Sequence, residues 1–84
     1  MGAAHSSVRR GDLPVVNVLR VTEVTRGDLE CIVVCCFCTH VHVHGLVEAD
    51  MWRAEAGPRM AQCKGGFYLV SMRAWQDAGS EVCK

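Results

Sequence analysis

The sequence predicts a small β-rich domain of the α+β class, built from a β-hairpin, a third strand and one short helix. Two runs of β-branched and aliphatic residues, separated by a turn, predict the hairpin. A cluster of cysteines and histidines follows directly after the second run. The chain has 84 residues. A core of that size is marginal, so such a domain usually needs disulfides, a metal ion or a partner for its stability.

The hairpin is the first element that the residue pattern supports. The run Val15–Thr25 is mostly β-branched, which favours a strand. Its apolar side changes near Leu19 and Arg20, and this change predicts a bulge or a shorter strand. The turn Arg26–Asp28 contains a glycine that can adopt a positive φ, and Leu29–Val34 forms the second strand.

The residues after the cysteine–histidine cluster change in character. Glu48–Ala56 favours a helix, with Asp50 as a possible N-cap and with Gly57 and Pro58 as its stop. Phe67–Met72 is rich in aromatic and aliphatic residues and predicts the third strand.

One domain over residues 14–73 accounts for these elements. Residues 1–13 are small and polar, which predicts a flexible N-terminal segment. Residues 74–84 are predicted to fray, with a short helix at Ala74–Ala78. No run reaches the roughly 18 apolar residues that a membrane span requires.

The six cysteines can belong to disulfides, to a metal site or to a core of free thiols. The first residues lack the apolar run of a secretion signal, so we expect an intracellular protein, cytoplasmic or nuclear, with reduced thiols. Cys35, Cys36 and Cys38 are too close in sequence to pair comfortably with one another. Disulfides would also leave the neighbouring histidines without a role. The pattern therefore favours a metal site.

The spacing of these residues predicts one structural zinc ion in a zinc-ribbon-like or knuckle-like site. Cys35 and Cys38 form a C-x-x-C pair, whose two intervening residues let both sulfurs face one point. His42 or His44 supplies the third ligand, and the spacing does not choose between them. Cys63 supplies the fourth ligand from a distant segment. Structural zinc contributes about 10 to 16 kcal/mol in small fingers, so we expect folding to depend on the metal.

Alternating histidines leave a catalytic alternative open. On a strand, His40, His42 and His44 would share one face. Three histidines with a water molecule in the fourth position make a hydrolytic zinc site. The simpler interpretation has one of them as a ligand, one in support and one facing solvent.

Structural roles are expected for the remaining cysteines. Cys31 is predicted to lie in the core, Cys36 to be a small packing residue, and Cys83 to be a free thiol. Four aromatic side chains are predicted to fill the core and cover the metal site: Trp52, Phe67, Tyr68 and Trp75.

The cysteine–histidine pattern resembles that of small uncharacterised zinc-finger-like proteins. Their Cys-Pro-aromatic-Cys-Gly knuckle leads to His-x-His-Gly and then to a Gly-His-Arg-x-x-His-Cys segment. The match covers Cys35 to Tyr68, about two fifths of the chain, and rests on Cys35-x-x-Cys38-x-x-x-His42-x-His44-Gly45 followed by Gly57-x-Arg59-x-Ala61-x-Cys63. The resemblance implies a short, mostly β zinc domain and brings no biochemical activity with it.

This chain departs from that pattern at four positions. Cys36 and Thr39 stand where the pattern has Pro and Gly. Pro58 and Gln62 stand where it has His. The change at Gln62 leaves Cys63 as the one ligand candidate of the second segment.

These features favour a non-enzymatic zinc-binding interaction module that contacts protein or nucleic acid. The formal net charge is zero, which favours a protein partner, because phosphate backbones attract basic surfaces. A zinc-dependent hydrolase that uses the histidine row is the second hypothesis. The third is an N-myristoylated membrane-surface adaptor, since the first six residues fit the short acylation pattern at Gly2.

Overall fold

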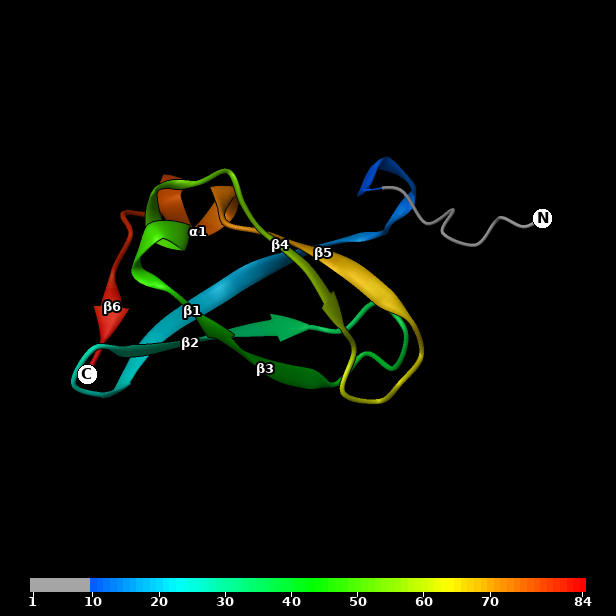
Figure 1. Ribbon diagram of the computed structural model, residues 1–84, viewed down its shortest axis with the longest axis horizontal. Coiled ribbons are helices and arrows are strands. Elements are labelled where there is room, and N and C mark those ends of the chain that lie inside the picture. The colour runs from blue at the N-terminus through cyan, green and yellow to red at the C-terminus, as the bar shows by residue number, and fades with distance from the viewer. Residues whose placement is uncertain (1–9) are drawn as a thin grey trace.

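Strands dominate the computed structural model, which describes residues 10–84 (Figure 1). The predicted acylation at Gly2 lies outside the described residues. The elements in chain order are η2 (Arg10–Asp12), β1 (Val15–Thr25), β2 (Asp28–Val34), β3 (Val41–Leu46), η3 (Glu48–Trp52), β4 (Glu55–Met60), β5 (Phe67–Ser71), α1 (Arg73–Asp77) and β6 (Val82–Cys83). The prediction of a small β-rich domain with one short α-helix is confirmed.

The long strand β1 is the centre of one mixed sheet. The strand order is β3-β2-β1-β5-β4, and β6 pairs separately with β1. β2 runs antiparallel to β1 through the predicted hairpin turn, where Gly27 has a φ of 83°. β5 and β6 both run parallel to β1 and pair with its first and second halves, respectively. The register between β1 and β2 shifts between Val18 and Arg20, which confirms the predicted bulge.

Strand β3 was not predicted, and its burial pattern explains why. The side chains of His42, His44 and Leu46 are buried, whereas Val41 and Val43 are exposed. This inverts the usual arrangement of an antiparallel strand, in which apolar residues face the core and polar residues face water. The histidines therefore share one face of a strand, and that face points inward.

The predicted helix over Glu48–Ala56 is wrong. Only a 3-10 turn forms at Glu48–Trp52, and β4 begins at Glu55. Asp50 is not the N-cap: its buried carboxylate lies within the turn and accepts the backbone N–H of Val47 at 2.9 Å.

The expected helix stop at Gly57 and Pro58 lies inside β4 instead. Gly57 has a φ of 95°, and the register with β5 shifts between Glu55 and Gly57, which marks a bulge. Pro58 pairs with Leu69 on a strand at the end of the sheet, where the missing N–H is tolerated.

The two outer strands, β3 and β4, face each other, so the sheet curls into a half-barrel (Figure 1). Side chains bridge the opening between them. The amide of Gln62 accepts the N–H of Val43 at 3.1 Å and donates to its carbonyl oxygen at 2.9 Å. The guanidinium of Arg59 donates to the carbonyl of Gly45 at 3.4 Å. These bridges use polar side chains where a closed barrel would use another strand.

The core fills the concave side of the sheet. Tyr68 and Trp75 are buried as predicted, but Trp52 is 77% exposed and Phe67 is 47% exposed, so the prediction that they pack in the core is wrong. The C-terminal residues contain α1, close to the predicted short helix, and then β6, which pairs with β1 where fraying was expected. The core cluster comprises Val16, Val18, Val21, Cys31, Val33, Cys35, Leu46, Ala56, Ala61, Tyr68, Val70, Met72 and Trp75.

Candidate metal centre

The turn between β2 and β3 holds two of the predicted ligands. The N–H of Cys35 donates to the carbonyl of His40, and the N–H of Thr39 donates to the carbonyl of Cys35, both at 2.9 Å. The N–H of Phe37 points at the sulfur of Cys35 from 3.3 Å. Thr39 has a φ of 65°, which lets the chain reverse over so few residues. The turn thereby directs the sulfurs of Cys35 and Cys38 to one side.

The turn between β4 and β5 carries Cys63. The N–H of Ala61 donates to the carbonyl of Gly66 at 2.9 Å, and that of Lys64 donates to Ala61 at 2.8 Å. Lys64 has a φ of 63°. This compact turn presents Cys63 at the same end of the half-barrel as the first turn.

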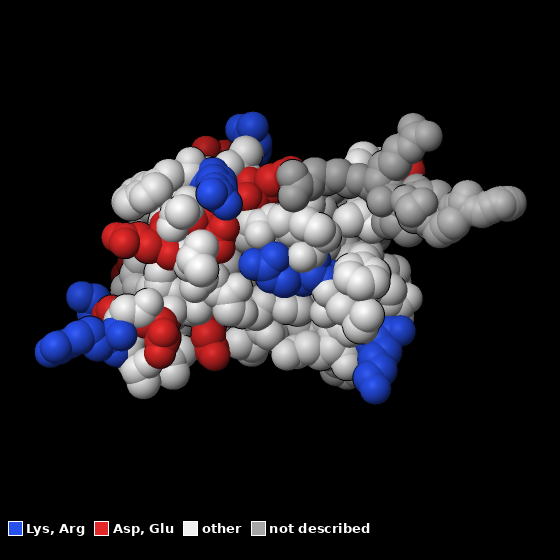
Figure 2. Space-filling model, viewed as in Figure 1, with Lys and Arg blue, Asp and Glu red and all other residues white. Residues whose placement is uncertain are grey.

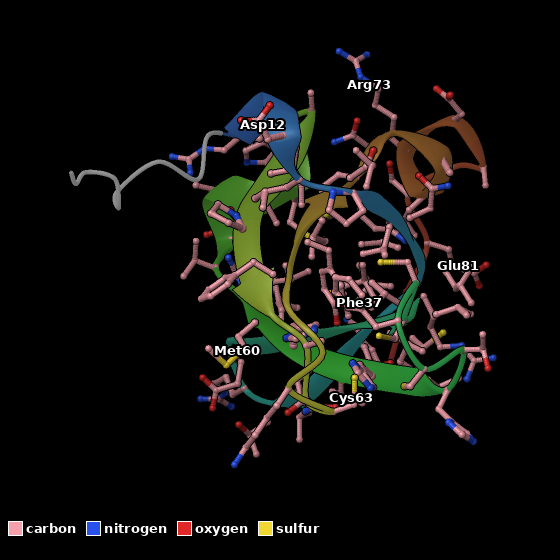
Figure 3. All side chains as sticks on the ribbon, turned by 90° about the vertical axis from the view of Figure 1, so that its right-hand side faces the viewer. Asp12, Phe37, Met60, Cys63, Arg73 and Glu81 are labelled. Atoms are coloured by element: carbon pink, nitrogen blue, oxygen red, sulfur yellow. The ribbon has the colours of Figure 1, made fainter. Side chains whose placement is uncertain are left out.

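The ring of Phe37 packs between the two turns. It stacks on Tyr68, with ring centroids 6.2 Å apart and planes inclined by 16°. A Cβ atom on Gly65 would lie 2.7 Å from the Cβ of Phe37, so only glycine allows this approach. Figure 3 looks at this end of the molecule, with Phe37 near the middle of the curled sheet and Cys63 on the turn below it.

Four side chains converge where the turns meet. The ligand atoms of Cys35, Cys38, His42 and Cys63 all lie within 4.8 Å of one another. The sulfurs of Cys35 and Cys63 are 3.8 Å apart, and Nε2 of His42 is 3.3 Å from the sulfur of Cys38. A tetrahedral zinc ion with Zn–S bonds of about 2.3 Å would separate two sulfurs by about 3.8 Å. The cluster has the size to hold one metal ion.

The other two histidines lie outside the cluster. His44 is buried and its Nε2 lies 2.5 Å from the hydroxyl oxygen of Tyr68. Burial, with smaller contributions from Arg59 and His42, lowers the pKa of His44, so its imidazole is neutral near pH 7. His40 is exposed and is not part of the group. The structure thus brings His42, rather than His44, to the cysteines.

A hydrogen-bonded chain supports the His42 ring. Its Nδ1 atom lies 3.2 Å from the hydroxyl of Tyr68, which in turn contacts His44. Burial, with nearby cysteine thiolates, raises the pKa of Tyr68 to about 12, so the phenol keeps its proton. With a metal on Nε2, Nδ1 carries the hydrogen and donates it to Tyr68, while Tyr68 donates to His44. This role of Tyr68 was not predictable from the sequence, because an aromatic residue in a strand is indistinguishable from an ordinary core residue.

The backbone N–H of Gln62 competes for the same nitrogen. It points at Nδ1 of His42 from 3.2 Å, and it can donate there only when Nδ1 carries no proton. A metal ion on Nε2 leaves the hydrogen of the neutral ring on Nδ1, and so favours the bond to Tyr68 over the bond from Gln62.

The pKa values of Cys35 and Cys38 are shifted in opposite directions. Burial acts to raise the pKa of Cys35, but hydrogen bonds from Cys38, Phe37 and Cys63 outweigh it and lower that pKa. A hydrogen bond from His40 lowers the pKa of Cys38, yet burial and the neighbouring Cys63 and Cys35 sulfurs leave it raised. A negative charge on Cys35 therefore disfavours a second negative charge on Cys38. A divalent cation among the sulfurs would remove this conflict.

The remaining cysteines divide between core and surface. Cys31 is fully buried, as predicted, and burial raises its pKa to about 11, which makes it an inert thiol. Cys36 is exposed rather than packed, because it lies between the two ligands of the first turn and faces away. Cys83 is a partly exposed free thiol on β6.

Comparisons of the chain with family models, curated proteins and solved structures found no match in any of the three. The resemblance to small zinc-finger-like proteins stays a prediction.

Proposed function

We propose that this chain is a non-enzymatic interaction module whose fold is held by one structural zinc ion. The observation that carries the proposal is the convergence of Cys35, Cys38, His42 and Cys63 from two turns of one sheet. Three thiolates and one imidazole are soft ligands of the kind that zinc takes in structural sites. Two facing turns that each contribute sulfur also make the site zinc-ribbon-like.

The ligand set argues against the hydrolase. Catalytic zinc sites keep a position open for water, whereas here four protein atoms lie within 4.8 Å of one another. The histidine row does not converge, since His42 joins the cysteines, His44 contacts Tyr68 and His40 faces solvent. No second cluster of metal-binding side chains was found among residues 10–84.

Two pairs of exposed apolar side chains at the strand ends next to the two turns support the interaction role. Val34 and Val41 pair across β2 and β3, and Met60 and Phe67 pair across β4 and β5. All four are exposed, with Val41 at 57% and Met60 at 52%. Exposed apolar side chains grouped in this way are typical of protein contact sites.

Charge and ring packing favour protein over nucleic acid as the partner. Lys64 is the only lysine or arginine within either metal-binding turn, 35–40 or 61–66. In Figure 2 the acidic side chains gather on the left half of the visible face, away from these turns at the lower right. The ring of Phe37 stacks on Tyr68 and lies against Gly66, so only part of it is exposed to a base. Among the described residues, no helix is long and apolar enough to cross a membrane.

Metal analysis of the purified protein tests the proposal. We expect one zinc ion per chain, and a cobalt-substituted form with the absorption of a tetrahedral thiolate-rich site. Cys35→Ser, Cys38→Ser and Cys63→Ser should each lose or weaken metal binding, while Cys31→Ser, which changes a buried cysteine outside the cluster, should keep the full stoichiometry. If the circular dichroism and the thermal midpoint of the wild-type chain do not change after chelation, zinc has no structural role.

Pull-down with the metal-loaded protein tests the contact surface. Captured proteins should be lost when Val41→Glu and Met60→Glu are combined, because the charges break the apolar surface. Trp52→Glu is the matched control, since Trp52 is exposed on η3. Equal loss with the control variant would mean that the surface beside the metal turns is not the contact site.

A further inference from the structure

The four ligands of the candidate metal centre differ sharply in exposure. Cys35 and His42 are buried, Cys38 is half-buried and Cys63 is exposed. Cys63 sits in the turn between β4 and β5, outside the strands themselves. A metal-bound cysteine is a thiolate at neutral pH, and thiolates are the form that oxidants attack. Of the three cysteines, Cys63 is the one most exposed to solvent-borne reagents.

A second cysteine, Cys35, lies beside Cys63. The sulfur of Cys35 lies 3.8 Å from that of Cys63, and Cys35 is fixed by backbone hydrogen bonds at the end of β2. Closing this gap to a disulfide length of about 2 Å needs a movement of less than a bond length on each side. The turn that carries Cys63 continues into two glycines, so it has the backbone freedom to make that movement.

We infer that Cys63 is a site of oxidative modification by hydroperoxides, and that its disulfide with Cys35 releases the metal. The inference rests on the metal centre proposed above and adds regulation to it. Loss of two of the four ligands leaves only Cys38 and His42, which is too few to hold a structural zinc ion. Release would loosen the two turns and the apolar surface beside them.

The chemistry balances with one molecule of hydrogen peroxide. The Cys63 thiolate attacks the peroxide, so an S–O bond forms, the O–O bond breaks and hydroxide leaves. The Cys35 thiolate then attacks the Cys63 sulfur, so the S–S bond forms and the S–O bond breaks, releasing a second hydroxide. Two protons from solvent convert both hydroxides into water. The cysteines lose two electrons, the peroxide gains them, and zinc leaves unchanged in charge.

The other cysteines should respond differently to the oxidant, so they serve as internal controls. Cys36 is exposed but is not a member of the cluster, so its oxidation leaves all four ligands in place. Cys31 is buried and protonated, and should not react. A disulfide between Cys35 and Cys38 would also release metal, but it joins the two ligands that are less exposed than Cys63.

The experiment treats the zinc-loaded full chain with hydrogen peroxide and follows release with a chromogenic chelator. Disulfides are mapped by mass spectrometry after alkylation at each time point. We expect release to coincide with a Cys35–Cys63 disulfide and to reverse with a thiol reductant and zinc. Cys36→Ser should release at the wild-type rate within about twofold, whereas Cys63→His, which keeps a zinc ligand but removes the exposed thiolate, should be slower by about tenfold or more.

The outcomes separate this inference from the proposed function. A chain that never binds zinc overturns both. A zinc-loaded chain that releases metal with mainly Cys35–Cys38 pairing, or that is oxidised at Cys36 without release, overturns only the role of Cys63. Should Cys63→His fail to fold, the disulfide map of the wild-type and Cys36→Ser proteins decides the question.

Discussion

The two ends of the half-barrel are held together by different kinds of interaction. At the end that carries α1, apolar side chains are buried in the ordinary way: Met72 is fully buried, and Trp75 is 5% exposed and donates its indole N–H to the carbonyl of Glu81 at 2.8 Å. Gln76 joins α1 to η3 by donating to the carbonyls of Met51 and Arg53. This end closes through packing and hydrogen bonds alone.

At the other end, the two turns meet through sulfur and nitrogen atoms. The surrounding apolar side chains, Phe37, Val41, Met60 and Phe67 among them, remain partly or largely exposed. Few kcal/mol of hydrophobic burial are available there, because exposed side chains have not left water. A chain this short therefore divides its stability between a packed end and a ligand-held end. The exposed apolar side chains beside the two turns lie at this ligand-held end, where Cys35, Ala61 and Tyr68 are the buried members of the core.

Removal of a metal ligand should have the largest effect on the stability of the domain. Cys35→Ser should abolish stoichiometric zinc binding and unfold the domain or shift its midpoint by tens of degrees, because structural zinc supplies about 10 kcal/mol or more. Cys31→Ala is the matched change in the packed core and should cost about 1 to 2 kcal/mol while keeping the zinc. Calorimetry and metal analysis on both variants give the measurement. Similar losses of zinc in both would show that the two regions are not separate.

A smaller effect is expected from the glycine that lets the two turns approach. Gly65→Ala places a Cβ atom 2.7 Å from that of Phe37 and should destabilise the domain by about 1 to 3 kcal/mol. Zinc affinity should fall with it, because the same contact positions both turns. Gly45→Ala is the control, since nothing lies within 4 Å of a Cβ at that position. Chemical denaturation measures the stability, and competition with a chelator measures the zinc affinity. Equal values for the two variants would contradict the prediction.

The packed end was more predictable from sequence than the ligand-held end. The β-branched run of β1, the glycine turn at Gly27 and the short helix after β5 each follow from local preferences, and tertiary contacts do not oppose them. The cysteine spacing also indicated which sulfurs a metal would need. Local pattern is sufficient where side-chain type and burial agree.

The strands β3 and β4 could not be predicted, because there local pattern and burial disagree. β3 turns His42 and His44 inward and its valines outward, which only the cysteine cluster and the hydroxyl of Tyr68 make favourable. β4 contains Gly57 and Pro58, which are typical of a break rather than a strand. His42 and His44 share one face, so spacing alone could not choose between them; the pairing of β3 with β2 places His42 nearer the turn.

The buried imidazole of His44 should make the stability of the domain depend on pH. Burial lowers the pKa of His44 below its ordinary value of 6.5, so the unfolded chain binds a proton more readily than the folded one. Its neutral form stabilises the fold above pH 6.5, and that stability is lost as the pH falls through and below this value. His44→Gln can still contact Tyr68 but cannot titrate, so its stability should fall less steeply between pH 7.5 and 5.5. Ligand protonation affects both proteins, and identical slopes would show that His44 is not desolvated.

The smallest predicted effect concerns the first turn, where Thr39 has a φ of 65°. A β-branched residue there is strained by about 1 to 2 kcal/mol, whereas glycine adopts a positive φ without a Cβ penalty. Thr39→Gly removes the strain but gives up the hydroxyl bond to the carbonyl of Cys38 and adds freedom to the unfolded chain. We expect a net gain of about 0.5 kcal/mol in the zinc-loaded protein. Thr39→Ala loses the same bond and keeps the strain, so it should be less stable than Thr39→Gly by about 1 kcal/mol. The reverse order in denaturant titrations would mean that backbone strain does not limit the turn, and that unfolded-chain entropy dominates at this position.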